Sequence, residues 1–302
     1  MQIGIFNGTV NDGTIDRLVD EAKQVEADGF ASFWAPHIFG HDPLTALAIV
    51  GREVPRIELG TSVVPTFIRH PMALAQQALS TNAVAGGRLT LGIGLSHQMV
   101  VEHMWGLSFD KPVGHMREYL SVLNPLMEGE QVAFAGEHFR VNAAIDARGT
   151  SKPGVVVAAL GEQMLRVTAA LADGTLTWCT GPKTLASHTV PTLRAAAEAA
   201  GRDATRVIAA LPVCVTDDVA SAQERASKVF AMYGQLPSYR AMLDREGAAG
   251  PADIVIAGSA DECADRVGSL ADVGVTDFAA VEFSTEPDEA AATRSMLKSL
   301  VA

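Results

Sequence analysis

The sequence predicts an α/β protein whose eight parallel strands close into a (β/α)8 barrel. Three observations point to this fold. Short apolar runs alternate with longer helical patterns from one end of the chain to the other, eight such units can be counted, and the 302 residues suit one large barrel domain. Hydrophobic residues make up 48% of the chain, enough for one large core. We therefore expect residues 1–302 to form a single domain.

The strands are expected where short apolar runs are bounded by glycine, proline or polar residues. They cover residues 3–6, 31–35, 57–64, 88–94, 155–159, 174–179, 207–215 and 276–283. The run at 57–64 is a clear buried strand.

Helical patterns follow the strands. In the first, apolar residues recur at helical spacing from Ile15 to Val25. The second begins with Asp42 as its N-cap and Pro43 at its first position. Helices are expected over residues 14–28, 43–50, 71–85, 113–127, 161–172, 183–200 and 287–300, with a further long helical region after residue 215.

The regular alternation stops between residues 95 and 154. This stretch holds a loop, the helix at 113–127 and a hairpin-like segment that turns around Ala135 and Gly136, so we expect an insertion after the fourth strand. The alternative fold is an open, doubly wound sheet. It would carry the fingerprint GxGxxG after its first strand, whereas residues 4–8 read GIFNG. The closed barrel is therefore preferred.

The composition excludes several classes of function. The chain has 23 Lys+Arg against 35 Asp+Glu, and it lacks the basic clusters that bind nucleic acid. Cys179, Cys214 and Cys263 lie too far apart for a CxxC metal site or a disulfide framework. No apolar run approaches the ~20 residues of a membrane-spanning helix, and no basic leader precedes the first strand. We expect a cytoplasmic protein that acts on a small molecule, without nucleic acid or membrane as partner.

Chemistry in a barrel of this kind is expected just after the C-terminal ends of the strands. These positions offer no pair of carboxylates, no lysine for a Schiff base and no HExxH spacing, so we expect an organic cofactor and no metal. His37 and His97 follow the second and fourth strands and are the candidate catalytic acids or bases; a structural role is the competing interpretation for each. Gly161 begins a helix that either binds an anion or forms a plain tight turn.

Four stretches together resemble the luciferase-like monooxygenase superfamily, and more closely its branch that uses the deazaflavin coenzyme F420. They are FWAPHIFGHDPLTALAIVG (33–51), LGTSVVPTFIRHPMALAQQALSTNAVAGGRLTLGIGLSH (59–97), ALGEQMLRVTAALADGTLTW (159–178) and SADECADRVGSLADVGVTDFAAVEF (259–283). The second stretch is the most specific, because its LGTSV run, its His-Pro helix start and its GGRLTLGIG run occur in the family's order and spacing. The resemblance implies a TIM barrel of the bacterial luciferase type, usually a homodimer.

The resemblance also implies where the coenzyme lies. In F420-binding members a bulge with a non-prolyl cis peptide, at the end of the third strand, backs the deazaflavin ring, and this position corresponds to Ser62 and Val63. Leu95 and Ser96 are expected beside the coenzyme, and residues 161–164 near its phosphate-bearing tail. The complete set of expected cofactor-binding residues is Thr61, Ser62, Val63, Leu95, Ser96, Ala159, Gly161, Glu162, Gln163 and Met164.

Two departures from the family pattern limit what can be carried over. Many members have an Asp-His pair after the second strand, whereas this chain reads WAPHIF at residues 34–39. Some sugar-phosphate dehydrogenases of the family have an acidic residue after a GxGTG run, whereas this chain reads GIGLSH at residues 92–97. A sugar-phosphate substrate is therefore unsupported. His97 becomes the leading candidate for the acid or base on the substrate side, with His37 as the second.

The resulting expectation is an F420-dependent oxidoreductase that moves a hydride between C5 of the deazaflavin and a small organic substrate. Trp34, Phe67, Trp105 and Trp178 would wall a dry pocket, although each could equally be ordinary core. Two alternatives keep the fold. One is an FMN-dependent monooxygenase that receives reduced flavin, and the other is a catalytically silent barrel that binds F420.

Overall fold

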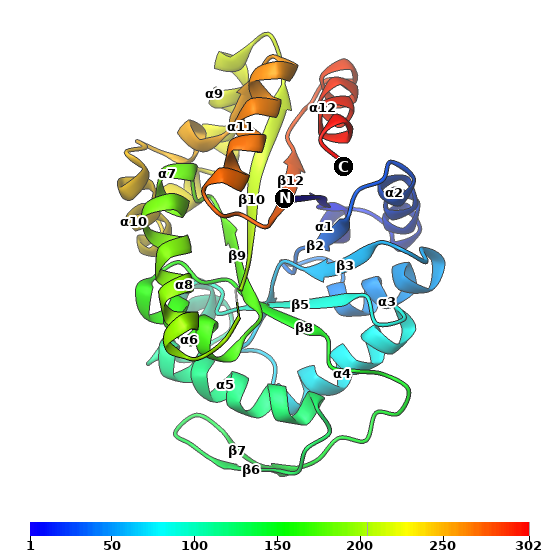
Figure 1. Ribbon diagram of the computed structural model, residues 1–302, viewed down its shortest axis with the longest axis vertical. Helices are drawn as coiled ribbons and strands as arrows, with labels where there is room; N and C mark the ends of the chain where they lie inside the picture. Colours follow the sequence, from blue (N-terminus) through cyan, green and yellow to red (C-terminus); the bar gives the residue numbers. More distant parts are fainter. Residues whose placement is uncertain (204, 302) are drawn as a thin grey trace.

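Eight parallel strands close into a barrel in the computed structural model, which describes residues 1–203 and 205–301 (Figure 1). Each strand pairs with the next, and the last pairs with the first, through registers such as Ile3 with Phe278. The barrel strands are β1 (Gln2–Phe6), β2 (Ser32–Ala35), β3 (Glu58–Thr61), β5 (Leu89–Gly94), β8 (Gly154–Val157), β9 (Gly174–Trp178), β10 (Arg206–Val215) and β12 (Asp277–Glu282). All eight strands expected from the sequence are confirmed.

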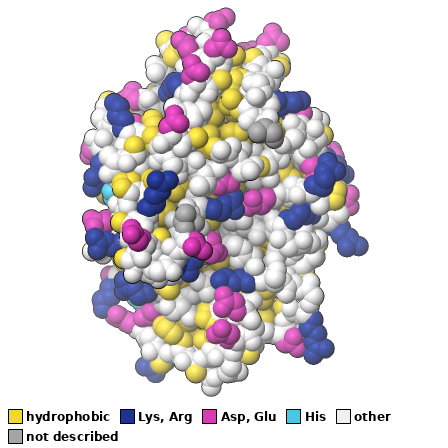
Figure 2. All heavy atoms as spheres, viewed as in Figure 1, with side chains coloured by type: hydrophobic (Ala, Val, Ile, Leu, Met, Phe, Trp, Pro, Cys, Tyr) yellow, Lys and Arg dark blue, Asp and Glu magenta, His cyan; other side chains and the backbone are white. Residues whose placement is uncertain are grey.

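Helices surround the barrel, and most begin and end close to where the sequence places them. The principal ones are α2 (Ile15–Ala27), α3 (Pro43–Glu53), α4 (Pro71–Val84), α5 (Pro112–Met127), α6 (Glu162–Leu171), α8 (Val190–Ala199), α9 (Val219–Val229), α10 (Pro237–Glu246), α11 (Ala260–Asp272) and α12 (Pro287–Ser299). As expected, Asp42 caps α3, since its carboxylate accepts a hydrogen bond from the backbone N–H of Thr45 at 2.8 Å. On the face shown in Figure 2, acidic and basic side chains are interspersed.

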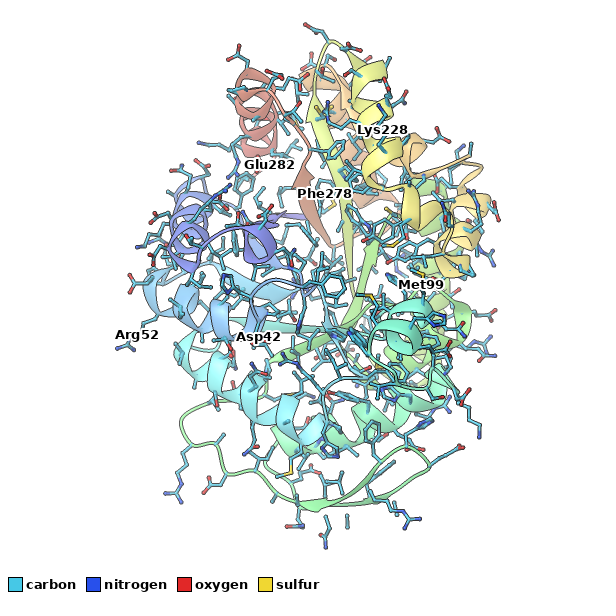
Figure 3. All side chains as sticks on the ribbon, turned by 180° about the vertical axis from the view of Figure 1, so that it is seen from behind. Asp42, Arg52, Met99, Lys228, Phe278 and Glu282 are labelled. Atoms are coloured by element: carbon cyan, nitrogen blue, oxygen red, sulfur yellow. The ribbon has the colours of Figure 1, made fainter. Side chains whose placement is uncertain are left out.

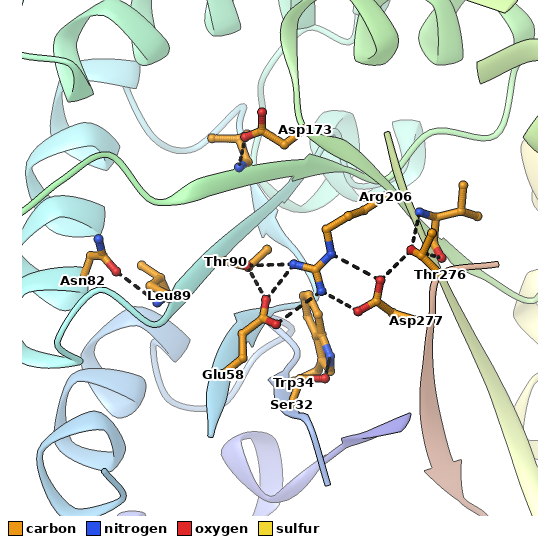
Figure 4. A network of polar contacts seen from close by, with 12 residues as sticks. Ser32, Trp34, Glu58, Asn82, Leu89, Thr90, Asp173, Arg206, Thr276 and Asp277 are labelled. Atoms are coloured by element: carbon orange, nitrogen blue, oxygen red, sulfur yellow. Dashed lines mark hydrogen bonds and ion pairs between the residues drawn. The ribbon is translucent and has the colours of Figure 1, made fainter. Parts of the chain in front are cut away.

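The N-terminal end of the barrel is closed by a polar network around Arg206 (Figure 4). The guanidinium donates to Glu58 at 2.8 Å and to Asp277 at 2.6 Å, and its Nη1 lies 3.3 Å from Thr90 Oγ1. Burial alone would lower the pKa of Arg206, but the hydrogen bonds and charges of Asp277 and Glu58 outweigh this effect and raise it. Four strands are thus held together by one cation between two carboxylates.

Trp34 fills the middle of the barrel above this network. Its side chain is fully buried, and its Nε1 donates to Ser32 Oγ at 2.8 Å. A Cβ at Gly60 would lie 2.2 Å from the indole ring, so only glycine leaves space for Trp34 on the neighbouring strand. Trp34 therefore belongs to the core, one of the two roles that the sequence left open, and does not wall a pocket.

Two features of the fold differ from the sequence-based expectations, and a third, the interruption of the third strand, lies where the family resemblance implies a bulge. The third strand is interrupted, because β3 ends at Thr61 and a two-residue strand, β4 (Val64–Pro65), resumes the pairing with β5. The helix expected over 183–200 is divided by a π-helical turn, Leu185–Thr189. The long helical region after residue 215 also contains a short strand, β11 (Ile256–Gly258), which pairs with the far end of β10. None of these features has a strong local sequence signal.

The segment between β5 and β8 contains the expected helix and hairpin. The hairpin pairs β6 (Val132–Ala135) with β7 (Arg140–Ala143). The carboxylate of Glu118 on α5 accepts hydrogen bonds from the backbone N–H groups of residues 137, 138 and 139, between 2.8 and 3.1 Å. Because α5 also packs between α4 and α6, it serves as the barrel helix of this unit, and the hairpin is attached to it.

A buried histidine lies beneath this hairpin and links stability to pH. His115 Nε2 lies 3.0 Å from Thr66 Oγ1, and the ring stacks on Phe67 with centroids 4.1 Å apart. Burial, and after it the neighbouring His138, lowers the pKa of His115 to about 4. A histidine with a lowered pKa in the folded state stabilises the protein above pH ~6.5 and loses that contribution as the pH falls toward 4.

We expect the free energy of unfolding to fall by about 2 kcal/mol through His115 as the pH drops from ~6.5 toward 4, allowing for partial access of solvent. The substitution His115→Gln keeps a polar partner for Thr66 but does not titrate. Urea unfolding of both proteins at several pH values measures the difference. Parallel stability curves for the two proteins would show that His115 is not the titrating group.

Candidate functional site

The C-terminal end of the barrel is floored by apolar side chains that are only partly buried. Phe6 on β1, Val63 after β3 and Trp178 on β9 pack on the central layer that contains Trp34. The rings of Phe6 and Trp178 are stacked, with centroids 6.1 Å apart and planes 22° from parallel. The opposite end of the barrel is closed by the Arg206 network, so the C-terminal end is where a ligand can be received.

The end of the third strand has the backbone conformation that the resemblance implies, since the peptide bond between Ser62 and Val63 is cis. Thr61 is fully buried, and its hydroxyl both donates to Gly92 O and accepts from Gly92 N, each at 2.8 Å. Thr61 therefore joins β3 to β5, while Ser62 and Val63 remain half-buried beside the floor. Of these three expected cofactor residues, Ser62 and Val63 are therefore accessible from the C-terminal end, whereas Thr61 is not.

After the fourth barrel strand, Leu95, Ser96 and His97 are all half-buried at the C-terminal end. Ser96 has a φ of 62°, a left-handed conformation that redirects the chain so that His97 follows a sharp turn. The ring of His97 lies edge-on to Tyr239 and Tyr233, with centroids 5.7 and 6.3 Å away. Burial lowers the pKa of His97, so the imidazole is neutral near pH 7 and can accept a proton.

His37, after β2, lies in a different setting. Its Nδ1 is buried and finds no hydrogen-bond partner within residues 1–203 and 205–301. Burial, and then the positive charge of Arg69, lowers the pKa of His37. Arg69 itself is paired with Asp42, which also accepts a hydrogen bond from Gln77 at 2.7 Å. Burial alone would raise the pKa of Asp42, but its bonds to Thr45 and Arg69 lower it.

The start of α6 is open to solvent directly after β8. Gly161 is the N-cap and has extended backbone, no side chain of the described chain caps the helix, and a Cβ built on Gly161 would meet nothing within 4 Å. Gly161, Glu162 and Gln163 are exposed, whereas Ala159 and Met164 are buried beneath them. The free backbone N–H groups and the helix dipole make this end of α6 suited to an anion.

The next helix start at the same end of the barrel follows β9 at Gly181, and its free backbone N–H groups are already occupied. The carboxylate of Glu246, from the end of α10, accepts hydrogen bonds from the backbone N–H groups of Thr184 at 2.7 Å and Lys183 at 3.2 Å. A Cβ at Gly181 would lie 2.3 Å from the carboxyl carbon of Glu246, so a larger residue there would displace this carboxylate. The protein therefore supplies its own anion at this position.

Sequence reasoning did not single out Tyr233, Tyr239 or Glu246, although it expects the region 230–250, in which they lie, to help shape the substrate pocket. They lie in the segment between β10 and β11, where no motif or spacing marks them, and only the tertiary fold brings this segment over β9 and the turn after β5. The aromatic chain is continuous there: Tyr233 contacts Tyr239 at 4.9 Å and Trp178 at 5.9 Å between ring centroids. Of the expected wall residues, Trp178 joins this aromatic chain, and Phe67 stacks on His115.

Within the part of the chain that the structure describes, no group of three or more His, Cys, Asp or Glu side chains is arranged to hold a metal ion. None of the helices described is both long enough and apolar enough to cross a lipid bilayer.

The family model described as luciferase-like monooxygenase matches residues 1–277. A 5,10-methylenetetrahydromethanopterin reductase of Methanolobus tindarius is 26% identical over 293 residues, which cover 87% of this chain and 89% of the reductase.

Two solved structures share the fold. The coenzyme F420-dependent tetrahydromethanopterin reductase of Methanopyrus kandleri superposes with a TM-score of 0.81 at 21% identity, covering 98% of this chain and 97% of the other. An F420-dependent secondary alcohol dehydrogenase gives a TM-score of 0.82 at 17% identity, covering 100% and 99% of the two chains. These likenesses confirm the barrel expected from the sequence.

Proposed function

The chain belongs to the luciferase-like monooxygenase family, and on that premise we propose that it is an F420-dependent oxidoreductase acting on a small organic substrate. The observation that supports this most strongly is the combination, at one end of the barrel, of an apolar floor, a neutral histidine against an aromatic wall, and an open helix start. Similar proteins named as F420-dependent enzymes favour the deazaflavin. A homodimer remains part of this proposal.

The residues at this end fit such a coenzyme. Phe6, Val63 and Trp178 form an apolar floor against which a flat ring can pack. The uncapped start of α6, with open space over Gly161, suits the phosphate of the tail. The buried, unpartnered Nδ1 of His37 marks a second polar position that the described protein groups leave unsatisfied. Ser62, Val63, Leu95 and Ser96 would lie along the ring.

When bound, F420 would supply a two-electron hydride donor or acceptor at C5. The protein's contribution is then to handle the accompanying proton and to exclude water. His97, neutral because of burial, would accept the proton of a substrate hydroxyl when the carbon is oxidised, and would return it to the oxygen in the reverse direction. Tyr233 and Tyr239 pack edge-on against the imidazole. His37 is the second candidate for this role.

A substitution at the start of α6 tests the proposed tail site. Gly161→Asp places a carboxylate at the N-cap, which should stabilise the helix by up to about 1 kcal/mol but repel a phosphate. We expect the dissociation constant for F420 to rise roughly 10- to 100-fold while the melting temperature stays level or rises. Coenzyme fluorescence and thermal unfolding measure the two effects.

Gly161→Asn is the matched control, because asparagine caps the helix equally well without adding charge. Its F420 affinity should stay much closer to that of the unmodified protein than the affinity of Gly161→Asp. Equal losses in both variants would point to crowding, and unchanged affinity in both would remove the phosphate from this position.

The FMN-dependent monooxygenase is the second candidate function, because the family is described as luciferase-like monooxygenase. The same floor and helix start would serve FMN. The two candidates differ in their use of oxygen, since a reduced flavin reacts with oxygen and a reduced deazaflavin does so poorly. Consumption of oxygen with reduced FMN would favour this second candidate.

A further inference from the structure

Three neighbouring loops at the C-terminal end of the barrel carry an unusual share of exposed apolar side chains. The loops cover residues 36–42, 66–70 and 95–111, the last of which contains the π-helical turn Val100–Met104, and they make up about a tenth of the chain. Among the described residues, eleven large apolar side chains are exposed, and six of them lie in these loops. We call these six the apolar rim: Ile38, Phe39, Ile68, Met99, Met104 and Leu107.

The exposure of the rim is substantial. Phe39 is 67% exposed and Met104 is 58% exposed. Leaving such large apolar side chains in water is unfavourable unless a ligand or partner covers them. In the view from behind, Met99 and Asp42, which belong to two of these loops, lie around the centre of the molecule on its near side (Figure 3).

The three loops are also tied together. Asp42 of the first is paired with Arg69 of the second, and Phe67 of the second stacks on Phe109 of the third with centroids 5.3 Å apart. The hydroxyl of Tyr119 donates to Arg69 O at 3.0 Å and holds the middle loop from below. His97 belongs to the third loop, so the rim is continuous in the chain with the proposed acid or base.

Several charged groups at this end of the barrel are paired within the protein. Arg69 is paired with Asp42, and Arg294 on α12 is paired with Glu282 at the end of β12. The helix start at Gly181 is filled by Glu246. These positions could otherwise have bound a substrate phosphate or carboxylate, and each is satisfied within the protein.

We propose that the substrate is an uncharged molecule with an extended apolar body, such as a ketone or secondary alcohol, whose reacting carbon lies near His97 while its body lies along the apolar rim. This proposal rests on the proposed function, since it names the substrate class of the same site. A neutral imidazole can exchange a proton with an uncharged hydroxyl or carbonyl group. The rim supplies apolar area that binds the rest of the substrate.

The test compares 2-ketones of increasing chain length with the same chains ending in a carboxylate. Each is titrated by calorimetry into the protein with and without F420. For the ketones we expect the affinity to rise about fourfold per methylene over several carbons. The carboxylates should bind at least tenfold more weakly than the ketones of equal length.

Variants locate the effect. Phe39→Ser combined with Met104→Ser should flatten the dependence on chain length. Ile49→Ser is the control, because Ile49 is an exposed apolar residue (44%) on α3, outside the rim. Lys183→Ala tests the exposed lysine at the next helix start, and should leave ketone affinity unchanged.

The outcomes separate the two proposals. If F420 fails to bind, the proposed function fails, while the ketone series on the protein alone still decides the role of the rim. Tighter binding of carboxylates, loss of binding in Lys183→Ala, or a ketone affinity that is independent of chain length would overturn the substrate class. If the rim variants alter only the oligomeric state, seen by light scattering, the rim is an interface between copies of the chain.

Discussion

Replacing His97 by asparagine should lower kcat/KM by roughly 10²- to 10⁴-fold, the usual contribution of a positioned general acid or base. The dissociation constant for F420 should change little, because His97 contacts Tyr233 and Tyr239 and is proposed to face the substrate and not the coenzyme. The assay follows coenzyme absorbance with the alcohol or ketone that reacts fastest. His103→Asn is a suitable control, since His103 is exposed in the same loop.

The pH profile distinguishes a catalytic from a structural role of His97. Burial lowers the pKa of His97, so the imidazole loses its ability to accept a proton only below the ordinary value of ~6.5. For alcohol oxidation we expect kcat/KM to fall on the acid side below that pH, and the His97→Asn variant to lose this limb. An intact acid limb in the variant would transfer the role to His37, whose pKa burial also lowers.

Replacing Arg206 by methionine should destabilise the protein by about 3 kcal/mol, one of the largest losses available from a single substitution in this chain. In the unmodified protein the Arg206 guanidinium lies 2.8 Å from Glu58 and 2.6 Å from Asp277. The substitution leaves these two carboxylates inside the barrel without that cation. The estimate is kept at the lower end of the range for buried pairs because the Arg206 side chain is 32% exposed.

Urea unfolding measures this loss through the shift of the midpoint. Arg166→Met is the matched control, since Arg166 forms an exposed pair with Glu162 on α6 and should cost no more than about 0.5 kcal/mol. Arg206→Lys keeps the charge but not the forked geometry, and should fall between the two. Equal effects of Arg206→Met and Arg166→Met would mean that the network does not hold the barrel closed.

The fold was predictable because its signals are local. Every barrel strand is an apolar run bounded by turn residues, and helices such as α3 announce their start with Asp42 and Pro43. The interruption of the third strand was expected only through the family resemblance, because neither Ser62 nor Val63 has a composition that marks it. β11 was missed because a strand of three residues inside a helical region has too little periodicity to be recognised.

The candidate site was predictable only in part, for the same physical reason. Strand ends can be read from the sequence, and so His37, His97 and the start of α6 could be named. The partners that shape these groups come from distant segments: Tyr239 is far from His97 in the chain, and Glu246 reaches the helix start at Gly181 from α10. Similarly, only the structure shows that Arg69 is paired with Asp42.

The central claim is that the C-terminal end of this barrel binds a deazaflavin. A titration of the purified protein with F420, and separately with FMN, followed by coenzyme fluorescence, tests it most directly. We expect saturable binding of F420 at micromolar concentration or below, with FMN bound far more weakly. Preferential binding of FMN, or no binding of either coenzyme, would contradict the claim.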